Sequence, residues 1–282
     1  MTNRVACQLF CFPVHQTAMF RYLTCTSSRS PFLSAISRIA VIKPYYEDDL
    51  VQLYQGDAVD LVGKLLSNLS LAAVVTDPPY ASGARTEAAK PSSGAMVPGR
   101  KWNSRPIDCD QMTTTGFVWT IREVVAAAQP HLVSGGAVLS FIDWRQWPNL
   151  VGALESLNLR VNGMLVWDKE FPGLGNGFRS QHELVCYASN GTARVIAKDT
   201  GNVFRSKRVP TDHHPSPKPV GLIEKMLRVV TIPGDLVIDP FAGSGTTLLA
   251  ARNLGRRCIG IERSPEHCET AATRLRQMCM AI

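Results

Sequence analysis

The chain has 282 residues, of which 45% are hydrophobic and 19% are charged. These proportions are typical of a soluble globular protein with a sizeable core, and they exclude a fibrous or wholly disordered chain. Thirty Lys and Arg against 23 Asp and Glu give a formal net charge of +7, which favours a polyanionic partner. No stretch approaches the roughly 20 consecutive apolar residues of a membrane-spanning helix. We therefore expect a cytoplasmic protein that does not engage a membrane.

The first 44 residues differ in composition from the rest of the chain. They contain no Asp or Glu, but they carry five basic residues: Arg4, Arg21, Arg29, Arg38 and Lys43. These residues show no sustained hydrophobic periodicity of a strand or a helix. We therefore expect a poorly ordered extension at 1–44, followed by one domain at 45–282. The composition also suits a transit peptide, and translation that begins at Met19 or later is a further reading.

The eight cysteines show no CxxC pair and no zinc-finger spacing. Closely spaced thiol and imidazole ligands are the usual signature of a structural zinc site. We therefore expect no metal and read the cysteines as reduced thiols.

From Leu50 onward, short runs rich in β-formers alternate with helical stretches. This alternation predicts parallel strands joined by crossover helices, hence an α/β fold with helices on both faces of a mostly parallel sheet. Seven strands are predicted: Leu50–Tyr54, Leu71–Thr76, Ala137–Ile142, Val161–Val166, Glu183–Tyr187, Leu236–Ile238 and Arg257–Ile261.

Helix signals lie before the last two predicted strands and after the last one. Apolar residues recur at three- and four-residue spacing from Leu222 to Val230, which predicts a helix with one apolar stripe facing a sheet. Ser264 followed by Pro265 is typical of an N-cap and a first helical position.

Two long irregular stretches, near 81–114 and 169–218, interrupt the pattern. Loops of this length are usually functional or disordered. The first carries Trp102 and a surplus of basic residues: Arg85, Lys90, Arg100, Lys101 and Arg105 against Glu87. It fits either a nucleic-acid contact or a solvated loop.

The run from Leu236 to Thr247 is an apolar strand followed by a Gly-rich turn and a helix start. This is the layout of a nucleotide-binding βα unit, in which Gly243 and Gly245 allow close approach of a ligand. Glu262 ends the next apolar strand, where a carboxylate can accept both hydroxyls of a ribose. The third Gly of the dinucleotide fingerprint is replaced by Leu248, so a purely structural turn remains an alternative.

Asp77-Pro78-Pro79-Tyr80 directly follows the predicted strand Leu71–Thr76. Open α/β sheets bind ligands at this carboxyl edge. The prolines stiffen the backbone and remove two N–H donors, while Asp77 adds a carboxylate and Tyr80 a flat ring. The combination suits a planar base with an exocyclic amino group, although an Asp-Pro-Pro turn can also simply end a strand.

Together with Asp239–Thr247 and His214–Pro219, the tetrapeptide resembles the amino-methylating DNA methyltransferases that use S-adenosylmethionine, in the β arrangement of motifs. Further similarities lie at Gly56-Asp57, Trp167–Lys169 and Arg179–Glu183, so the resemblance covers nearly all of 45–282. Its motif order implies a circularly permuted, Rossmann-like sheet of seven strands, in which the strand ending at Tyr54 lies beside the strand ending at Glu262. It also implies long loop insertions that contact DNA.

The resemblance assigns roles to individual residues. It implies that Asp57 accepts from the cofactor's adenine, that Glu262 holds the ribose, and that Lys218 with Ser216 lies near the methionine carboxylate. Asp239 and the following turn would hold the methionine part, through Phe241, Ala242, Gly243, Ser244, Gly245 and Thr246. This chain has Ser216-Pro217 where the family commonly has Thr-Gln, and a plain loop Asp is the alternative for Asp57.

The resemblance further implies catalysis by Asp77, Pro78, Pro79 and Tyr80 on a base extruded from double-stranded DNA. Adenine N6 is favoured, because cytosine N4 members more often carry Ser in place of Asp77. A protein-glutamine methyltransferase would carry Asn-Pro-Pro-Tyr and place its cofactor strand first. A dinucleotide-dependent dehydrogenase leaves Asp77–Tyr80 unexplained, and a non-catalytic DNA-binding module is the remaining alternative.

DNA contacts are predicted in the two insertions. The candidate residues are Arg85, Arg100, Lys101, Trp102, Arg105, Arg205, Lys207 and Arg208. Some members of the family pair, so the resemblance leaves a homodimer open. The target DNA sequence cannot be predicted.

Overall fold

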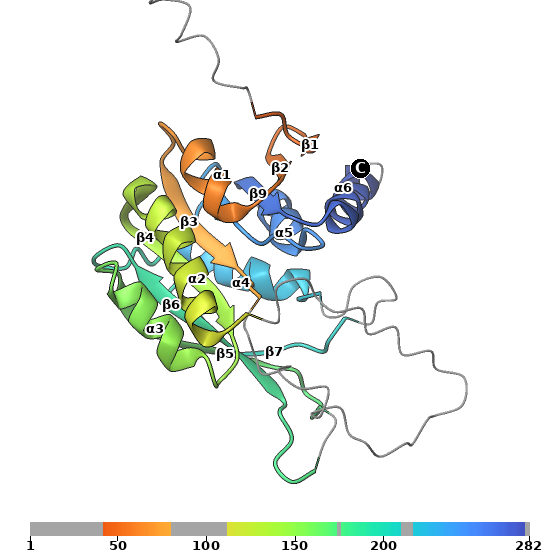
Figure 1. Cartoon of the computed structure of the whole chain (residues 1–282). Coiled ribbons are helices and arrows are strands. Elements are labelled where there is room, and N and C mark those ends of the chain that lie inside the picture. The colour runs from red at the N-terminus through yellow and green to blue at the C-terminus, as the bar shows by residue number, and fades with distance from the viewer. Residues whose placement is uncertain (1–41, 80–111, 174–175, 210–216, 280–282) are drawn as a thin grey trace, which may run out of the picture. The chain divides into compact units, whose positions relative to one another are not determined.

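The computed structural model describes residues 42–79, 112–173, 176–209 and 217–279 (Figure 1). From Lys43 onward they belong to one compact unit. The predicted extension 1–44 lies almost wholly outside the described residues, so its boundary stays a prediction. No helix in these described ranges is long and apolar enough to cross a membrane.

One sheet of nine strands runs through the described part of the chain. Its strands are β1 Tyr46–Glu47, β2 Val51–Gln55, β3 Leu71–Thr76, β4 Leu132–Ile142, β5 Arg160–Asp168, β6 His182–Ser189, β7 Val203–Arg205, β8 Leu236–Asp239 and β9 Arg257–Glu262. All seven predicted strands are present. The two additional strands, β1 and β7, are short and lie at the two edges, in the order β1-β2-β9-β8-β3-β4-β6-β5-β7.

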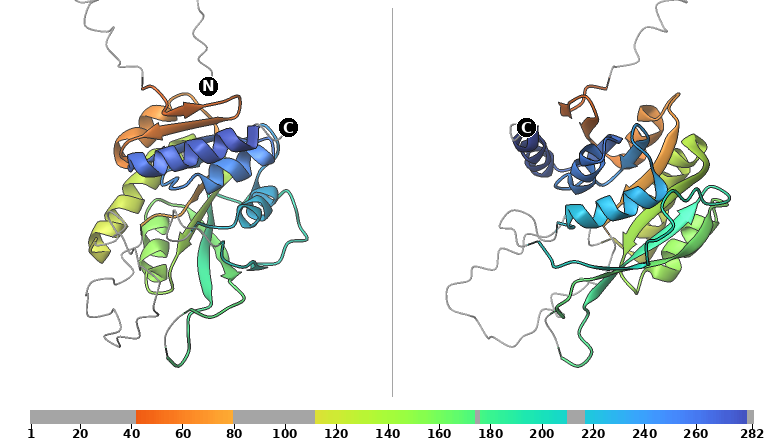
Figure 2. Two further views of the ribbon diagram at one scale, coloured as in Figure 1. Left: turned by 90° about the vertical axis from the view of Figure 1, so that its right-hand side faces the viewer. Right: turned by 180° about the vertical axis from the view of Figure 1, so that it is seen from behind.

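Helices cover both faces of the sheet, which confirms the predicted layers (Figure 2). Contacts join α1 to α2 and α2 to α3 in one layer, and α4 to α5 and α5 to α6 in the other. The helices are α1 Ala58–Leu65, α2 Thr114–Ala128, α3 Trp147–Glu155, α4 Val220–Val230, α5 Thr246–Asn253 and α6 Pro265–Cys279, with a 3-10 helix η3 at Gln129–His131.

Two strands that are distant in the sequence, β2 and β9, are neighbours in the sheet. β2 pairs with β9 in parallel, with Gln55 opposite Glu262, and β9 continues the parallel run through β8 to β3. This pairing confirms the permuted order implied by the resemblance. β6 runs antiparallel to β4 and to β5, so the sheet is mostly but not wholly parallel.

Local sequence explains the central elements. All six residues of β3 are buried, as expected for a strand covered on both faces. The apolar stripe predicted on α4 is the buried face of that helix: Leu222, Ile223, Met226, Leu227 and Val230. Ser264 caps α6 as predicted, because its hydroxyl lies 3.4 Å from the N–H of His267. At these elements the local sequence pattern and the tertiary packing agree.

The turn between β8 and α5 depends on glycine. Gly245 has a φ of +79°, and a Cβ there would lie 2.9 Å from the Cβ of Ala271 in α6. We expect Gly245→Ala to lower the free energy of unfolding by about 1–3 kcal/mol, because it combines left-handed strain with overpacking. Chemical denaturation measures this change.

Gly221 in α4 provides the matched control, since a Cβ there meets nothing within 4 Å. Gly221→Ala should be neutral or stabilise by up to about 1 kcal/mol, because alanine favours a helix. Equal stabilities for the two variants would contradict the assigned turn geometry.

Candidate functional site

Four acidic residues lie along one edge of the sheet because four adjacent parallel strands end there. Asp57 follows β2, Glu262 ends β9, Asp239 ends β8 and Asp77 follows β3. Parallel strands bring their carboxyl ends to a common edge, which is where open α/β sheets bind ligands. Residues distant in the sequence are thereby assembled into one site.

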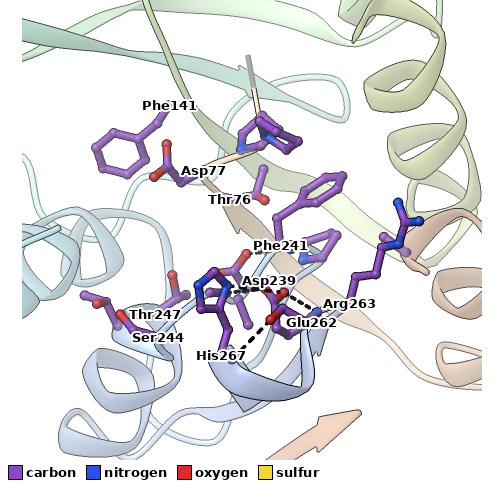
Figure 3. Close-up of a pocket in the computed structure, with 18 of the residues that line it drawn as sticks. Thr76, Asp77, Phe141, Asp239, Phe241, Ser244, Thr247, Glu262, Arg263 and His267 are labelled. Carbon is purple, nitrogen blue, oxygen red and sulfur yellow. Dashed lines mark hydrogen bonds and ion pairs between the residues drawn. The ribbon is translucent and has the colours of Figure 1, made fainter. Parts of the chain in front are cut away.

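A cavity of about 630 Å³ opens at this edge and all four acidic residues line it. Figure 3 shows three of them, Asp77, Asp239 and Glu262. The volume is within the range of about 300–1,000 Å³ that small-ligand sites occupy. Of the predicted site residues, Pro78, Pro79, Lys218, Phe241, Ala242, Gly243, Ser244 and Thr246 also line it. Gly245 does not line it and instead shapes the turn.

Glu262 is held by backbone donors from two turns. Its Oε2 accepts from the N–H of Gly243 at 2.8 Å, and its Oε1 accepts from the N–H of Ser264 at 2.7 Å. Burial acts to raise the pKa of Glu262, but hydrogen bonds from His267, Ser264 and Gly243 lower it below its ordinary value. The result is an ionised acceptor fixed at the cavity wall.

Asp239 is almost fully buried, with 3% of its surface exposed. Burial raises its pKa to about 7, although hydrogen bonds from Thr247 and from the Phe241 N–H act in the opposite direction. A carboxylate with this pKa suits a cationic partner, since a nearby positive charge favours the ionised form.

Asp57 caps the first turn of α1, because its side chain accepts from the N–H of Val59 at 2.9 Å. Gly56 just before it donates to the Glu262 carbonyl at 2.9 Å, which ties the end of β2 to the end of β9. Asp57 therefore has a structural role that the sequence did not predict, in addition to its place on the cavity.

The Gly-rich turn is tied to the last helix. Arg274 in α6 donates to the Ser244 carbonyl at 2.5 Å and to the Ser244 hydroxyl at 3.0 Å. The same guanidinium lies 3.3 Å from the Thr246 hydroxyl. Ser244 and Thr246 are thus oriented by a residue that no motif indicated.

Lys218 lies on the cavity and has two ion-pair partners that the resemblance did not suggest. Its ammonium lies 2.5 Å from Oδ2 of Asp77 and 3.2 Å from Oε2 of Glu183. Lys169 completes the group, with its ammonium 2.5 Å from Oε1 of Glu183. Glu183 lies in a segment that the resemblance marked, but only the fold brings it to Lys218, which in turn contacts Asp77.

Other residues on the cavity were not foreseen. His267 lies on the cavity in the first turn of α6, with Nδ1 3.6 Å from Oε1 of Glu262. Phe141, Trp119 and Arg263 also line the cavity. Their positions follow from tertiary packing, although the predicted cap at Ser264 could have indicated His267.

Several predicted residues lie outside the described ranges. These are Tyr80, Ser216, Arg85, Arg100, Lys101, Trp102 and Arg105. Arg205, Lys207 and Arg208 are described and exposed, on and after β7. Among the described residues, no group of three or more His, Cys, Asp or Glu is arranged to hold a metal ion.

The fold is an α/β sheet in which four adjacent parallel strands each end near an acidic residue on one cavity. A family model described as DNA methylase, of the N6/N4 type, matches residues 71–273. The match covers more than half of the chain. The protein therefore belongs to the N6/N4 DNA methylase family, whose members are amino-methyltransferases that use S-adenosylmethionine.

Comparisons with individual proteins are consistent with this family assignment. The type II methyltransferase M2.LlaDCHI of Lactococcus lactis subsp. cremoris is 26% identical over 267 residues, which cover 84% of this chain and 93% of that protein. The structure of M1.HpyAVI in complex with SAM is 26% identical with a TM-score of 0.60, and the match covers 80% of this chain and 100% of that chain.

A third similarity concerns the fold alone, since its identity is low. The PvuII DNA methyltransferase, described as cytosine-N4-specific, is 18% identical with a TM-score of 0.64. The match covers 82% of this chain and 88% of that chain. It supports the Rossmann-like architecture and does not bear on the target base.

Proposed function

We propose that the protein transfers a methyl group from S-adenosylmethionine to N6 of adenine in double-stranded DNA. The observation that carries the proposal is that Asp77, at the end of β3, lines the same cavity as the Gly243 turn and Glu262. One cavity thus has a wall suited to a nucleoside cofactor and a carboxylate suited to an amino group.

The cavity has the donors and acceptors that this cofactor requires. The Glu262 carboxylate suits two ribose hydroxyls, and Asp239 suits the ammonium of the methionine part. Phe241 and Asp57, which also line the cavity, suit the adenine ring and its amino group. When bound there, the cofactor supplies a methyl group on a positively charged sulfur.

The target side of the site is Asp77 with the two prolines. An adenine amino group is a weak nucleophile, since its lone pair is delocalised into the ring. Acceptance of its two hydrogens by Asp77 and the Pro78 carbonyl would favour a pyramidal nitrogen and make the lone pair available. Methylation then releases one amino hydrogen as a proton, which Asp77 can accept. In this proposal Tyr80 stacks on the extruded base.

Exposed aromatic and basic side chains supply a DNA-contact surface near the hairpin of β5 and β6. Phe178 is fully exposed, Phe171 is 65% exposed, and the ammonium of Lys207 lies 5.7 Å from the centre of the Phe171 ring. Arg205 and Arg208 are exposed beside Lys207 in the chain. Basic groups suit phosphates, and exposed rings suit bases.

Analysis of product nucleosides tests the proposal. The protein is incubated with mixed-sequence duplex DNA and labelled S-adenosylmethionine, and the digested DNA is analysed by mass spectrometry. N6-methyladenine is expected, because cytosine-N4 members of the family that the chain resembles more often carry Ser at the position of Asp77. If only N4-methylcytosine appears, the base assignment is wrong, and if calorimetry detects no cofactor binding, a non-catalytic DNA-binding module is the better reading.

Glu262 provides a prediction specific to the cofactor side. Glu262→Ala should weaken S-adenosylmethionine binding by about 1–3 kcal/mol, the cost of a lost charged hydrogen bond. The rate at saturating cofactor should change much less. Calorimetry and single-turnover kinetics separate the two effects, and a slow rate at unchanged affinity would contradict this role.

A further inference from the structure

Four charged side chains form a connected row, and three of them, Glu183, Lys218 and Asp77, line the cavity. Lys169 contacts Glu183, Glu183 contacts Lys218, and Lys218 contacts Asp77, at N to O distances of 2.5, 3.2 and 2.5 Å. They come from the end of β5, from β6, from the segment before α4 and from the end of β3. The charges alternate in sign along the row, so the row is neutral overall.

Burial differs along the row. The side chains of Lys169, Glu183 and Lys218 are 9%, 15% and 7% exposed, whereas that of Asp77 is 34% exposed. Removing each ion from water costs several kcal/mol, which pairing often offsets only in part, and apolar residues of similar volume are often at least as stable. Stability alone therefore does not account for the row, whose most exposed member faces the site.

The electrostatics keep the buried members charged. Burial acts to lower the pKa of Lys218, but the carboxylates of Asp77 and Glu183 raise it above its ordinary value. Burial acts to raise the pKa of Glu183, but Lys218 and Lys169 lower it. The Lys218 ammonium also lies 5.1 Å from the centre of the Phe141 ring, which restricts its position further.

We propose that Lys218 is a positioning residue for methyl transfer, which holds the Asp77 carboxylate toward the target amino group, and that Glu183 and Lys169 hold Lys218 in place. The inference rests on the proposed function, in which Asp77 receives the amino hydrogens. It differs from the role implied by the resemblance, in which Lys218 contacts the methionine carboxylate of the cofactor.

The two roles predict different kinetics for Lys218→Met, which keeps the length of the side chain and removes its charge. If Lys218 positions Asp77, the single-turnover rate at saturating S-adenosylmethionine and DNA should fall about 100-fold or more, a loss typical of a misplaced polar group in an active site. Cofactor affinity, measured by calorimetry, should stay within about threefold. Weakened affinity with a normal rate at saturation would overturn the inference.

Two further variants test whether the loss of rate comes from the row of charged side chains. Glu183→Gln keeps the shape of the side chain but removes the charge behind Lys218, so it should also slow the single-turnover rate and leave cofactor affinity unchanged. Lys225 is an exposed lysine on α4, and Lys225→Met is the control for the loss of a positive charge. A loss of rate for Lys225→Met as large as for Lys218→Met would overturn the inference.

A measurement that needs no turnover separates this inference from the proposed function. The ¹⁵N resonance of the Lys218 ammonium is recorded by NMR in the wild-type protein and in Asp77→Asn. A clear shift is expected, because the ammonium loses its charged partner, and an unchanged resonance would overturn the inference even if the wild type methylates DNA. If the wild type methylates no DNA but the shift is present, the proposed function is wrong and the pairing of Lys218 with Asp77 stands.

Discussion

Asp77→Ala should reduce the single-turnover rate of methyl transfer by about 10³-fold or more while cofactor affinity stays within about threefold. The Asp77 carboxylate follows β3 on the cavity, whereas Glu262 ends β9 and accepts from the N–H of Gly243. Loss of a group that accepts a proton or stabilises charge in a transition state typically costs about 10²–10⁴-fold in rate. Rapid-quench kinetics with labelled cofactor give the rate, and calorimetry gives the affinity.

Asp60→Ala is the control for this variant, since Asp60 is an exposed acidic residue on α1. It should leave both quantities unchanged. Because Asp77→Ala removes the partner of a buried lysine, thermal unfolding must show that the variant is folded at the assay temperature. A folded Asp77→Ala protein with weak cofactor binding and a normal rate at saturation would reverse our placement of the two sides of the site.

Binding of S-adenosylmethionine should strengthen by about tenfold per pH unit between pH 5 and pH 7. The buried Asp239 has its pKa raised to about 7, so in the ligand-free protein it is protonated below that pH. If the ionised form pairs with the cofactor ammonium, each unit below pH 7 costs about 1.4 kcal/mol of affinity. Calorimetry in buffers of different ionisation enthalpy should also detect a proton released on binding near pH 6.

Asp239→Asn tests the source of this pH dependence. The variant should bind weakly at pH 7 and show a flat profile between pH 5 and pH 7, because its amide does not titrate. His267 also lies on the cavity, and histidine is a residue type that can change its charge between pH 5 and 8. A profile that remains steep in Asp239→Asn and becomes flat in His267→Gln would assign the effect to the histidine.

The sequence predicted the framework well because local signals there agree with the fold. β3 has the predicted bounds, Leu71–Thr76, and the apolar stripe of α4 is its buried face. β4 begins earlier than predicted, at Leu132, in a segment where Gly135 has a φ of +76° and no simple alternation appears. β7 has three residues, and it forms because it pairs with β5, which is tertiary information.

The site was predicted in part for the same reason. Residues in continuous motifs, such as Asp77 and the Gly243 turn, could be placed on the cavity from the sequence, because strand ends in α/β folds carry ligands. Lys218, Glu183 and Lys169 belong to three separate segments, so their contacts could not be inferred from spacing. The guanidinium of Arg274 supports the Gly-rich turn from α6, and nothing in its local sequence indicates that contact.

The order of strands also determines when the protein can fold. β2 and β3 are synthesised early, but the strands that lie between them in the sheet, β9 and β8, are the last two in the chain. Until these emerge, the inner edges of β2 and β3 have no partner, and an unpaired edge is prone to association with other chains. Contacts between distant parts of a chain also close slowly, since they require large loops to be ordered first. Because β8 and β9 carry Asp239 and Glu262, the wall assigned to the cofactor is the last part of the sheet to assemble.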